Sequence, residues 1–127
     1  MSDHKKYLLK YWKFLSLSQE LSDGQRFPHM DPVEEHLLNM LSNFWNDGKK
    51  ITVMQAMRLP NTISSTTVHR RLKSLQMKGL IELKACNSDN RIKNILSTQL
   101  TQRYFDMLGR ALVAANIEPS NSKVFER

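Results

Sequence analysis

Between residues 64 and 99 the pattern of apolar residues changes from a helical period to an extended one, and this change most limits the fold. The first part repeats aliphatic residues on one helical face, namely Val68, Leu72 and Leu75. Gly79 follows as a helix stop. Residues 80–83 and 91–99 are then rich in apolar residues on either side of a polar turn at 87–90. This pattern predicts a helix followed by a β-hairpin.

Three further helices are expected around this segment. Asp31 followed by Pro32 is typical of a helix N-terminus, and Thr52 begins a shorter helix that ends in a turn at residues 59–62. Thr101 is predicted to cap the last helix, whose apolar face is Tyr104, Phe105, Leu108, Leu112 and Val113. The order of elements is that of a winged helix-turn-helix. The expected fold is therefore mainly α, with a small β-hairpin wing and dimerisation helices at both ends of the chain.

The first thirty residues contain one more helix, which is expected to stop at residues 22–24. Its apolar residues form a broad stripe consisting of Tyr7, Leu8, Tyr11, Trp12 and Leu15. A helix at the edge of a small domain rarely needs so much apolar surface. The stripe could be covered by the body of the domain or by the same helix of a second chain, and the second case predicts a homodimer.

Size and charge limit the function classes. The chain has 127 residues, enough for one domain, and carries 19 Lys and Arg against 12 Asp and Glu, a net charge of +7. Such a basic domain is expected to bind a polyanion, with nucleic acid a better candidate than a membrane surface. No apolar run reaches the roughly 18 to 20 residues of a membrane span. A single cysteine cannot form an internal disulfide, so we expect a cytoplasmic protein.

The basic residues are concentrated on the helix after Ser64 and on the hairpin, whereas residues 31–47 contain no Lys or Arg. Small hydroxyl residues at a helix start allow close approach to a DNA groove, and Arg matches guanine or phosphate. With the aliphatic face turned inward, most of the polar residues turn outward. The candidate DNA-contacting residues are Ser64, Ser65, Thr66, Thr67, His69, Arg70, Arg71 and Lys73, with Lys93 on the hairpin.

Several motifs within residues 31–112 occur in an order that resembles the MarR family of bacterial transcriptional regulators. They lie at residues 51–53, 66–72, 78–81, 89–91 and 100–101. The resemblance implies a homodimer that places recognition helices in successive major grooves and wings on the flanking minor grooves. It also implies that Arg91 is the wing-tip arginine and that Asp89 orients it. The implied dimer contacts are Tyr7, Leu8, Tyr11, Trp12 and Leu15 with Phe105, Leu108 and Leu112. Tyr104 departs from the family, which often has glycine there.

We therefore expect three regions: an N-terminal dimerisation helix and linker (1–30), a winged helix-turn-helix DNA-binding domain (31–100), and a C-terminal helix and tail (101–127). The predicted function is sequence-specific binding of double-stranded DNA at a pseudo-palindromic operator, as a homodimeric regulator and more specifically a repressor. A small molecule or another protein could act as effector, and no membrane is involved. The alternative is a winged-helix adaptor that binds protein without sequence-specific DNA binding.

Catalysis is not expected, because the sequence has no phosphate-binding loop, nucleophile motif or paired catalytic carboxylates. No cofactor or metal is expected either. A metal site built from His29, Asp31, Glu35 and His36 is conceivable, but capping acids and exposed histidines explain the same residues. Cys86 lies beside Lys84, which would favour the thiolate, although nothing else indicates a redox role.

Overall fold

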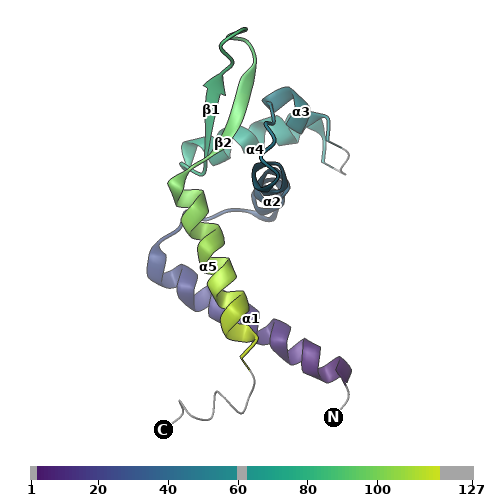
Figure 1. The fold of residues 1–127 in the computed structure, drawn as a ribbon, viewed down its shortest axis with the longest axis vertical. Coiled ribbons are helices and arrows are strands. Elements are labelled where there is room, and N and C mark those ends of the chain that lie inside the picture. The colour runs from purple at the N-terminus through teal and green to yellow at the C-terminus, as the bar shows by residue number, and fades with distance from the viewer. Residues whose placement is uncertain (1–2, 60–62, 118–127) are drawn as a thin grey trace. The chain divides into compact units, whose positions relative to one another are not determined.

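The computed structural model describes residues 3–59 and 63–117, arranged as two compact units (Figure 1). Residues 28–102 form the central unit, and residues 1–27 with 103–127 form the terminal unit. The elements in chain order are α1 (Asp3–Gln25), α2 (Pro32–Asn46), α3 (Val53–Met57), α4 (Ser65–Met77), β1 (Ile81–Ala85), β2 (Lys93–Ser97) and α5 (Gln99–Ala115). The predicted turn residues 60–62 and the predicted tail after residue 117 lie outside the described residues.

The helix starts in the central unit are set by side chains that bind free amide groups. Asp31 accepts the amide of Glu34 at 2.8 Å, and the Glu34 carboxylate accepts the amide of Asp31 at 2.9 Å, which completes a capping box. Thr52 and Gln55 form the same arrangement at the start of α3. Ser64 accepts the amide of Thr67 at 3.2 Å at the start of α4. The helix starts predicted at Asp31 and Thr52 are confirmed, and Ser64 caps α4.

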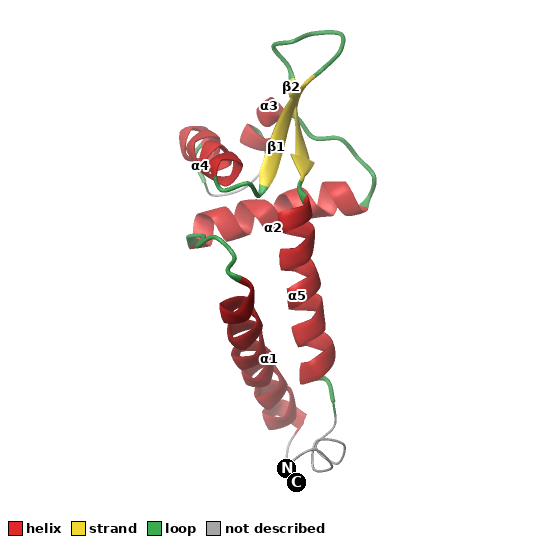
Figure 2. Ribbon diagram, turned by 90° about the vertical axis from the view of Figure 1, so that its left-hand side faces the viewer, coloured by secondary structure: helices red, strands yellow, loops and turns green. Residues whose placement is uncertain are grey.

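The wing is a two-stranded antiparallel sheet in which Ile81 pairs with Ser97 and Ala85 pairs with Lys93. Figure 2 shows the two strands next to α3 and α4. The base of the wing is bonded to the helices, because the amide of Ile95 donates to the carbonyl of Ile51 at 2.8 Å. The indole of Trp45 also donates to the carbonyl of Ile95 at 3.0 Å. These bonds fix where the hairpin leaves the unit.

The core of the central unit lies between α2, α4 and the hairpin. Its buried side chains are Leu37, Leu38 and Leu41 of α2, Val68, Leu72 and Leu75 of α4, and Ile51, Leu80, Ile81 and Ile95. Burial of the three α4 residues confirms the inner face predicted from their spacing. Burying each such side chain contributes roughly 1.5–3 kcal/mol to folding. The predicted fold class, a mainly helical winged helix-turn-helix with a small hairpin, is therefore confirmed.

Two predicted element boundaries are wrong. The last helix begins at Gln99, and its cap is Thr98, whose hydroxyl accepts the amide of Thr101 at 3.3 Å. Thr101 is instead fully buried and donates to the carbonyl of Leu80. The first helix does not stop at residues 22–24 but continues to Gln25, and Arg26 takes the left-handed conformation that ends it, with φ at 55°.

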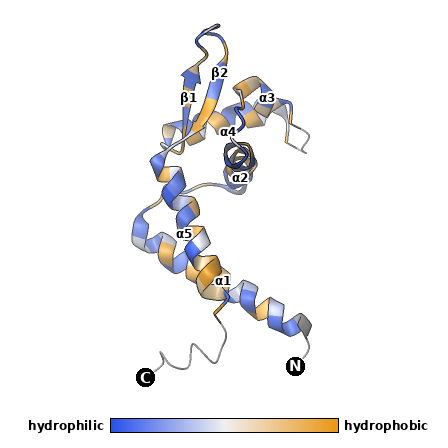
Figure 3. Cartoon of the chain, in the orientation of Figure 1, coloured by the Kyte–Doolittle hydropathy of each residue, from blue (hydrophilic) through white to orange (hydrophobic). Residues whose placement is uncertain are grey.

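The terminal unit combines α1 with most of α5, and apolar residues recur along both helices (Figure 3). Phe27 packs edge-on against Tyr104, with ring centroids 5.5 Å apart. Among the described residues of this unit, those that are buried are Met107, Ala111 and Ala115. The predicted apolar face of α5 is therefore not the buried face of the single chain, since Leu112 is 59% exposed and Val113 is 72% exposed.

The stripe predicted on α1 is also largely solvent-exposed in the single chain. Tyr7, Tyr11 and Trp12 are each more than half exposed, and Leu8 and Leu15 are 37% and 45% exposed.

Among the described residues, no helix is both long enough and apolar enough to cross a membrane.

Candidate nucleic-acid interface

The exposed face of α4 is the first part of the candidate interface. Because Val68, Leu72 and Leu75 turn inward, the side chains on the opposite face are open to solvent. This face carries Thr66, His69, Arg70 and Lys73. It combines a small hydroxyl side chain near the helix start with two full positive charges, a combination suited to groove edges and phosphates.

Two hydroxyls predicted to contact DNA are engaged within the helix cap. The Ser64 hydroxyl donates to the Thr67 hydroxyl at 2.9 Å, in addition to accepting the Thr67 amide. Thr67 is half-buried, whereas Ser64 and Ser65 are exposed. Ser64 and Thr67 therefore hold the start of α4 in place, and Ser65 and Thr66 leave their side chains on its surface.

Arg71 lies in a different environment from Arg70. Its side chain is 38% exposed, and Nη2 lies 3.2 Å from Oδ2 of Asp31 at the start of α2. The Nε atom of Arg71 is buried and has no hydrogen-bond partner among the residues that the structure describes. Of the two adjacent arginines, Arg70 is exposed on the surface of the helix and Arg71 is half-buried.

The wing presents one arginine that is held by a neighbouring carboxylate. Nε and Nη2 of Arg91 donate to the two carboxylate oxygens of Asp89 at 3.2 and 3.1 Å. The backbone amide of Arg91 donates to the same carboxylate at 2.9 Å, and these bonds lower the pKa of Asp89 below its ordinary value. The Arg91 side chain is nevertheless 91% exposed. Asp89 therefore restricts the direction of Arg91 without burying it.

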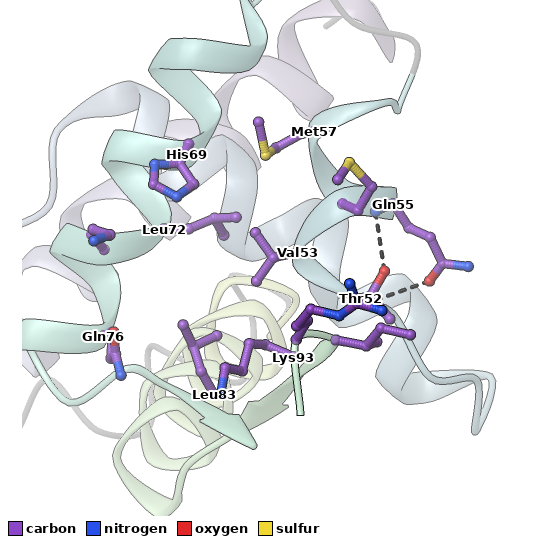
Figure 4. Close-up of a pocket in the computed structure, with 13 residues that line it drawn as sticks. Thr52, Val53, Gln55, Met57, His69, Leu72, Gln76, Leu83 and Lys93 are labelled. Carbon is purple, nitrogen blue, oxygen red and sulfur yellow. Dashed lines mark hydrogen bonds between the residues drawn. The ribbon is translucent and has the colours of Figure 1, made fainter. Parts of the chain in front are cut away.

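A groove of about 800 Å³ lies between α3, α4 and the wing (Figure 4). Its apolar wall includes Val53 of α3, Leu72 of α4 and Leu83 of β1. Its basic lining residues are Lys73 of α4 with Arg91 and Lys93 of the wing, joined by His69. The fold thus brings together basic residues that are about twenty positions apart in the sequence.

Sequence reasoning missed a buried polar cluster that joins α2 to α4. Glu34 is only 2% exposed, and its carboxylate accepts hydrogen bonds from Lys78 at 2.8 Å and from Ser74. Burial alone would raise the pKa of Glu34, but the bonds from Lys78, Ser74 and the Asp31 amide outweigh it and lower this pKa to about 2. The capping-box spacing identified Glu34 as a cap residue. Its pairing with Lys78, 44 positions away, has no local signal.

The remaining candidates are the conceivable metal site around His29 and His36 and the cysteine Cys86. Within residues 3–59 and 63–117, no three His, Cys, Asp or Glu side chains come together as a metal site would require, and this includes the set around His29 and His36. Cys86 is half-buried, with its sulfur 3.2 Å from the hydroxyl of Ser88. That hydrogen bond is the main reason that the pKa of Cys86 is lowered, and the nearby lysine charge is that of Lys50, not the predicted Lys84.

Comparison with known proteins gives matches in structure but not in sequence. No family model matches the chain, and no curated protein matches it. The heme sensor protein PefR from Streptococcus agalactiae in complex with heme aligns with a TM-score of 0.57 and 17% identity, covering 97% of this chain and 82% of that chain. A mutant of MepR from S. aureus bound to an oligodeoxyribonucleotide aligns with a TM-score of 0.61 and 14% identity, covering 99% and 91%.

A third solved structure agrees with these two. The YusO protein from Bacillus subtilis aligns with a TM-score of 0.55 and 20% identity, covering 90% of this chain and 76% of that chain. At these identities the likeness shows the fold, and it extends over nearly the whole chain. The chain therefore has the winged helix-turn-helix fold of MarR-type regulators.

Proposed function

We propose that this protein is a transcriptional regulator that binds double-stranded DNA in a sequence-specific manner as a homodimer. The observation that carries the proposal is the exposed basic face of α4 next to the exposed Arg91 of the wing. A winged helix uses these two elements to contact a major groove and a neighbouring minor groove. The oligodeoxyribonucleotide in the similar MepR structure supports this use of the fold.

The two parts of the interface have different roles in this proposal. Arg70 reads base edges in the major groove, while Lys73 and His69 lie beside it and contact the DNA backbone. Arg91 enters a minor groove, where narrow A·T-rich sequence concentrates negative potential. Asp89 keeps the guanidinium pointed in one direction and must release or share it when DNA binds.

The second chain of the dimer covers the exposed apolar residues of the terminal unit. The exposed ones in the proposed contact are Tyr7, Leu8, Tyr11, Trp12 and Leu15 of α1 and Leu112 of α5, and the half-buried Phe105 and Leu108 of α5 lie beside them in the sequence. Contiguous apolar surface of this kind is unusual on a soluble monomer. A two-fold symmetric dimer would present two recognition helices and so recognise a pseudo-palindromic operator.

Regulation follows from occupancy of the operator. A dimer bound across a promoter excludes polymerase, which makes the protein a repressor. An effector would release it by changing the spacing of the two recognition helices. PefR is described as a heme sensor, and this supports a small molecule as the effector class without identifying it for this chain.

The decisive experiment is selection of bound sequences from a random duplex pool. We expect enrichment of a site with two-fold symmetry, bound much more tightly than unrelated duplex of the same length. Recovery of an asymmetric half-site would contradict the dimer but not DNA binding. Binding that does not discriminate among duplexes would contradict the proposed function and favour the protein-binding adaptor.

A further inference from the structure

Side chains on one face of α4 bind the segment that leads into α2. Arg71, Ser74 and Lys78 are spaced three and four residues apart and therefore lie on one side of the helix end. Arg71 contacts the carboxylate of Asp31, and Lys78 donates to the carbonyl of His29 at 2.6 Å and to Glu34 at 2.8 Å. Ser74 donates to the other oxygen of Glu34. Residues 29–34 are thus bound to α4 at several points.

The environment of Arg71 is better suited to binding residues 29–34 than to contacting DNA. More than half of its side chain is withdrawn from solvent, one nitrogen is buried with no hydrogen-bond partner among the described residues, and another is paired with Asp31. Freeing the guanidinium to reach a phosphate would leave the Asp31 carboxylate without its charged partner. Arg70, one residue earlier, is exposed and does not carry this cost.

We infer that Arg71 is a positioning residue that acts through Asp31 to fix the direction of the recognition helix, and not a DNA-contacting residue. This inference rests on the proposed function. Base contacts depend on the angle at which a helix enters the groove, whereas phosphate contacts tolerate small rotations. Loosening the Arg71–Asp31 pair therefore reduces discrimination between sequences more than it reduces binding to DNA in general.

The test compares Arg71→Gln, Asp31→Asn and the double variant on a selected duplex and on random duplex. Asn is a good helix cap, so Asp31→Asn removes the charge while keeping the start of α2. We expect each single change to lower the ratio of specific to random affinity about tenfold, the size of one misaligned base contact. The double variant should lose no more than either single variant, because both break the same pair.

Salt dependence separates positioning from contact. A residue that neutralises a phosphate lowers the slope of log affinity against log salt by about 0.9 when it is removed. We expect Arg71→Gln to leave this slope unchanged, whereas the matched control Lys73→Gln, with the same charge change on the exposed face, should lower it. A reduced slope for Arg71→Gln, with Asp31→Asn having no effect on discrimination, would overturn the inference.

A readout that needs no DNA keeps the two proposals separate. Amide hydrogen exchange at Glu34 and Glu35, in the first turn of α2, reports whether this turn is held. We expect several-fold faster exchange in Arg71→Gln and no further increase in the double variant. If the wild-type protein shows no sequence preference, the proposed function fails, but amide exchange still tests whether the Arg71–Asp31 pair holds the first turn of α2. If exchange is unchanged in both variants, the Arg71–Asp31 pair does not hold this turn and the inference is overturned.

Discussion

Glu34 is a carboxylate that the protein keeps charged although it is almost fully buried. Burying a charge is unfavourable unless hydrogen bonds and a counter-charge replace water. Here the Lys78 ammonium group, the Ser74 hydroxyl and the backbone amide of Asp31 do so. The bonds from Lys78 and Ser74 join the start of α2 to α4. The stability of the central unit should therefore depend on the ionisation of this one residue.

Acid should weaken the fold through Glu34. Its pKa falls from an ordinary 4.5 to about 2 in the folded protein, so its stabilising contribution is complete above about pH 4.5 and is lost as the pH falls toward 2. The difference corresponds to about 3 kcal/mol. Urea unfolding between pH 2 and 7 should show this loss in the wild type and a flatter dependence in Glu34→Gln. The exposed Glu35→Gln, one residue away, should behave like the wild type in this pH range.

Arg70 and Lys73 should have separable effects on DNA binding. Arg70→Ala is expected to cost about 1–3 kcal/mol on the selected site and to relax specificity, because a base contact is removed. Lys73→Ala should weaken binding to all duplexes alike and lower the salt slope by about one. Titrations on selected and random duplex at several salt concentrations measure both effects. Equal losses on the two duplexes for Arg70→Ala would refute its role in reading bases.

The inward and outward faces of α4 could be predicted at the residue scale, but the partners of its boundary residues could not. The helical period alone assigned Val68 to the core and Arg70 to the surface, and both are found there. Arg71 lies at the edge of the two faces. Its environment is decided by Asp31, forty positions earlier, and no local pattern carries that information.

At the scale of elements, the wing is a hairpin whose base is held by hydrogen bonds and whose turn is exposed to solvent. Its base is bonded to Ile51 and Trp45, while Arg91 extends from the turn and is held by Asp89. A side chain so restricted loses less conformational freedom on entering a groove than a free one does. The wing should therefore contribute to affinity by position and charge, with little dependence on base identity.

Replacing Arg91 by Ala should lower DNA affinity several-fold or more, with the greatest loss on sites whose flanks are A·T-rich. Thermal stability should change little, because an exposed ion pair at a turn contributes little to the fold. The measurement is a titration of both proteins on two duplexes that share a core and differ in their flanks. If the variant binds both duplexes as tightly as the wild type, the wing does not contact DNA.

The order of the elements was predictable because each has strong local signals, whereas two of their ends were not. Thr98 and Thr101 are three residues apart and either could cap α5, and the choice depends on the buried bond from Thr101 to Leu80. Gly24 suggested a helix stop, but α1 passes through it. A bond from Gln19 to Asp23 at 2.8 Å supports that last turn. A tertiary contact therefore determines the start of α5, and a side-chain pair within the helix supports the last turn of α1.

At the scale of the whole molecule, the two units differ in how completely they bury their apolar residues. The central unit encloses a continuous core from α2, α4 and the hairpin. The terminal unit buries Met107, Ala111 and Ala115 but leaves Trp12 55% exposed and Leu112 59% exposed. In our proposal the central unit binds DNA and the terminal unit binds a second copy of the chain, so disrupting the dimer should leave the central fold intact.

We predict a dimer in solution that a single charge in the apolar stripe separates. Sedimentation of the wild type at micromolar concentration should give about twice the chain mass of 14.8 kDa. Trp12→Glu should give a monomer, because a carboxylate would have to be buried without a partner at the contact between chains. Met77→Glu is the matched control, since Met77 is an apolar residue 88% exposed on α4, outside the stripe. This control should remain dimeric, and both variants should keep the wild-type helical content by circular dichroism.

The Trp12→Glu monomer should bind the symmetric site far more weakly than the wild type, since only one recognition helix is then engaged at a time. A wild-type protein that sediments as a monomer, yet binds the symmetric site tightly, would contradict the role assigned to the terminal unit.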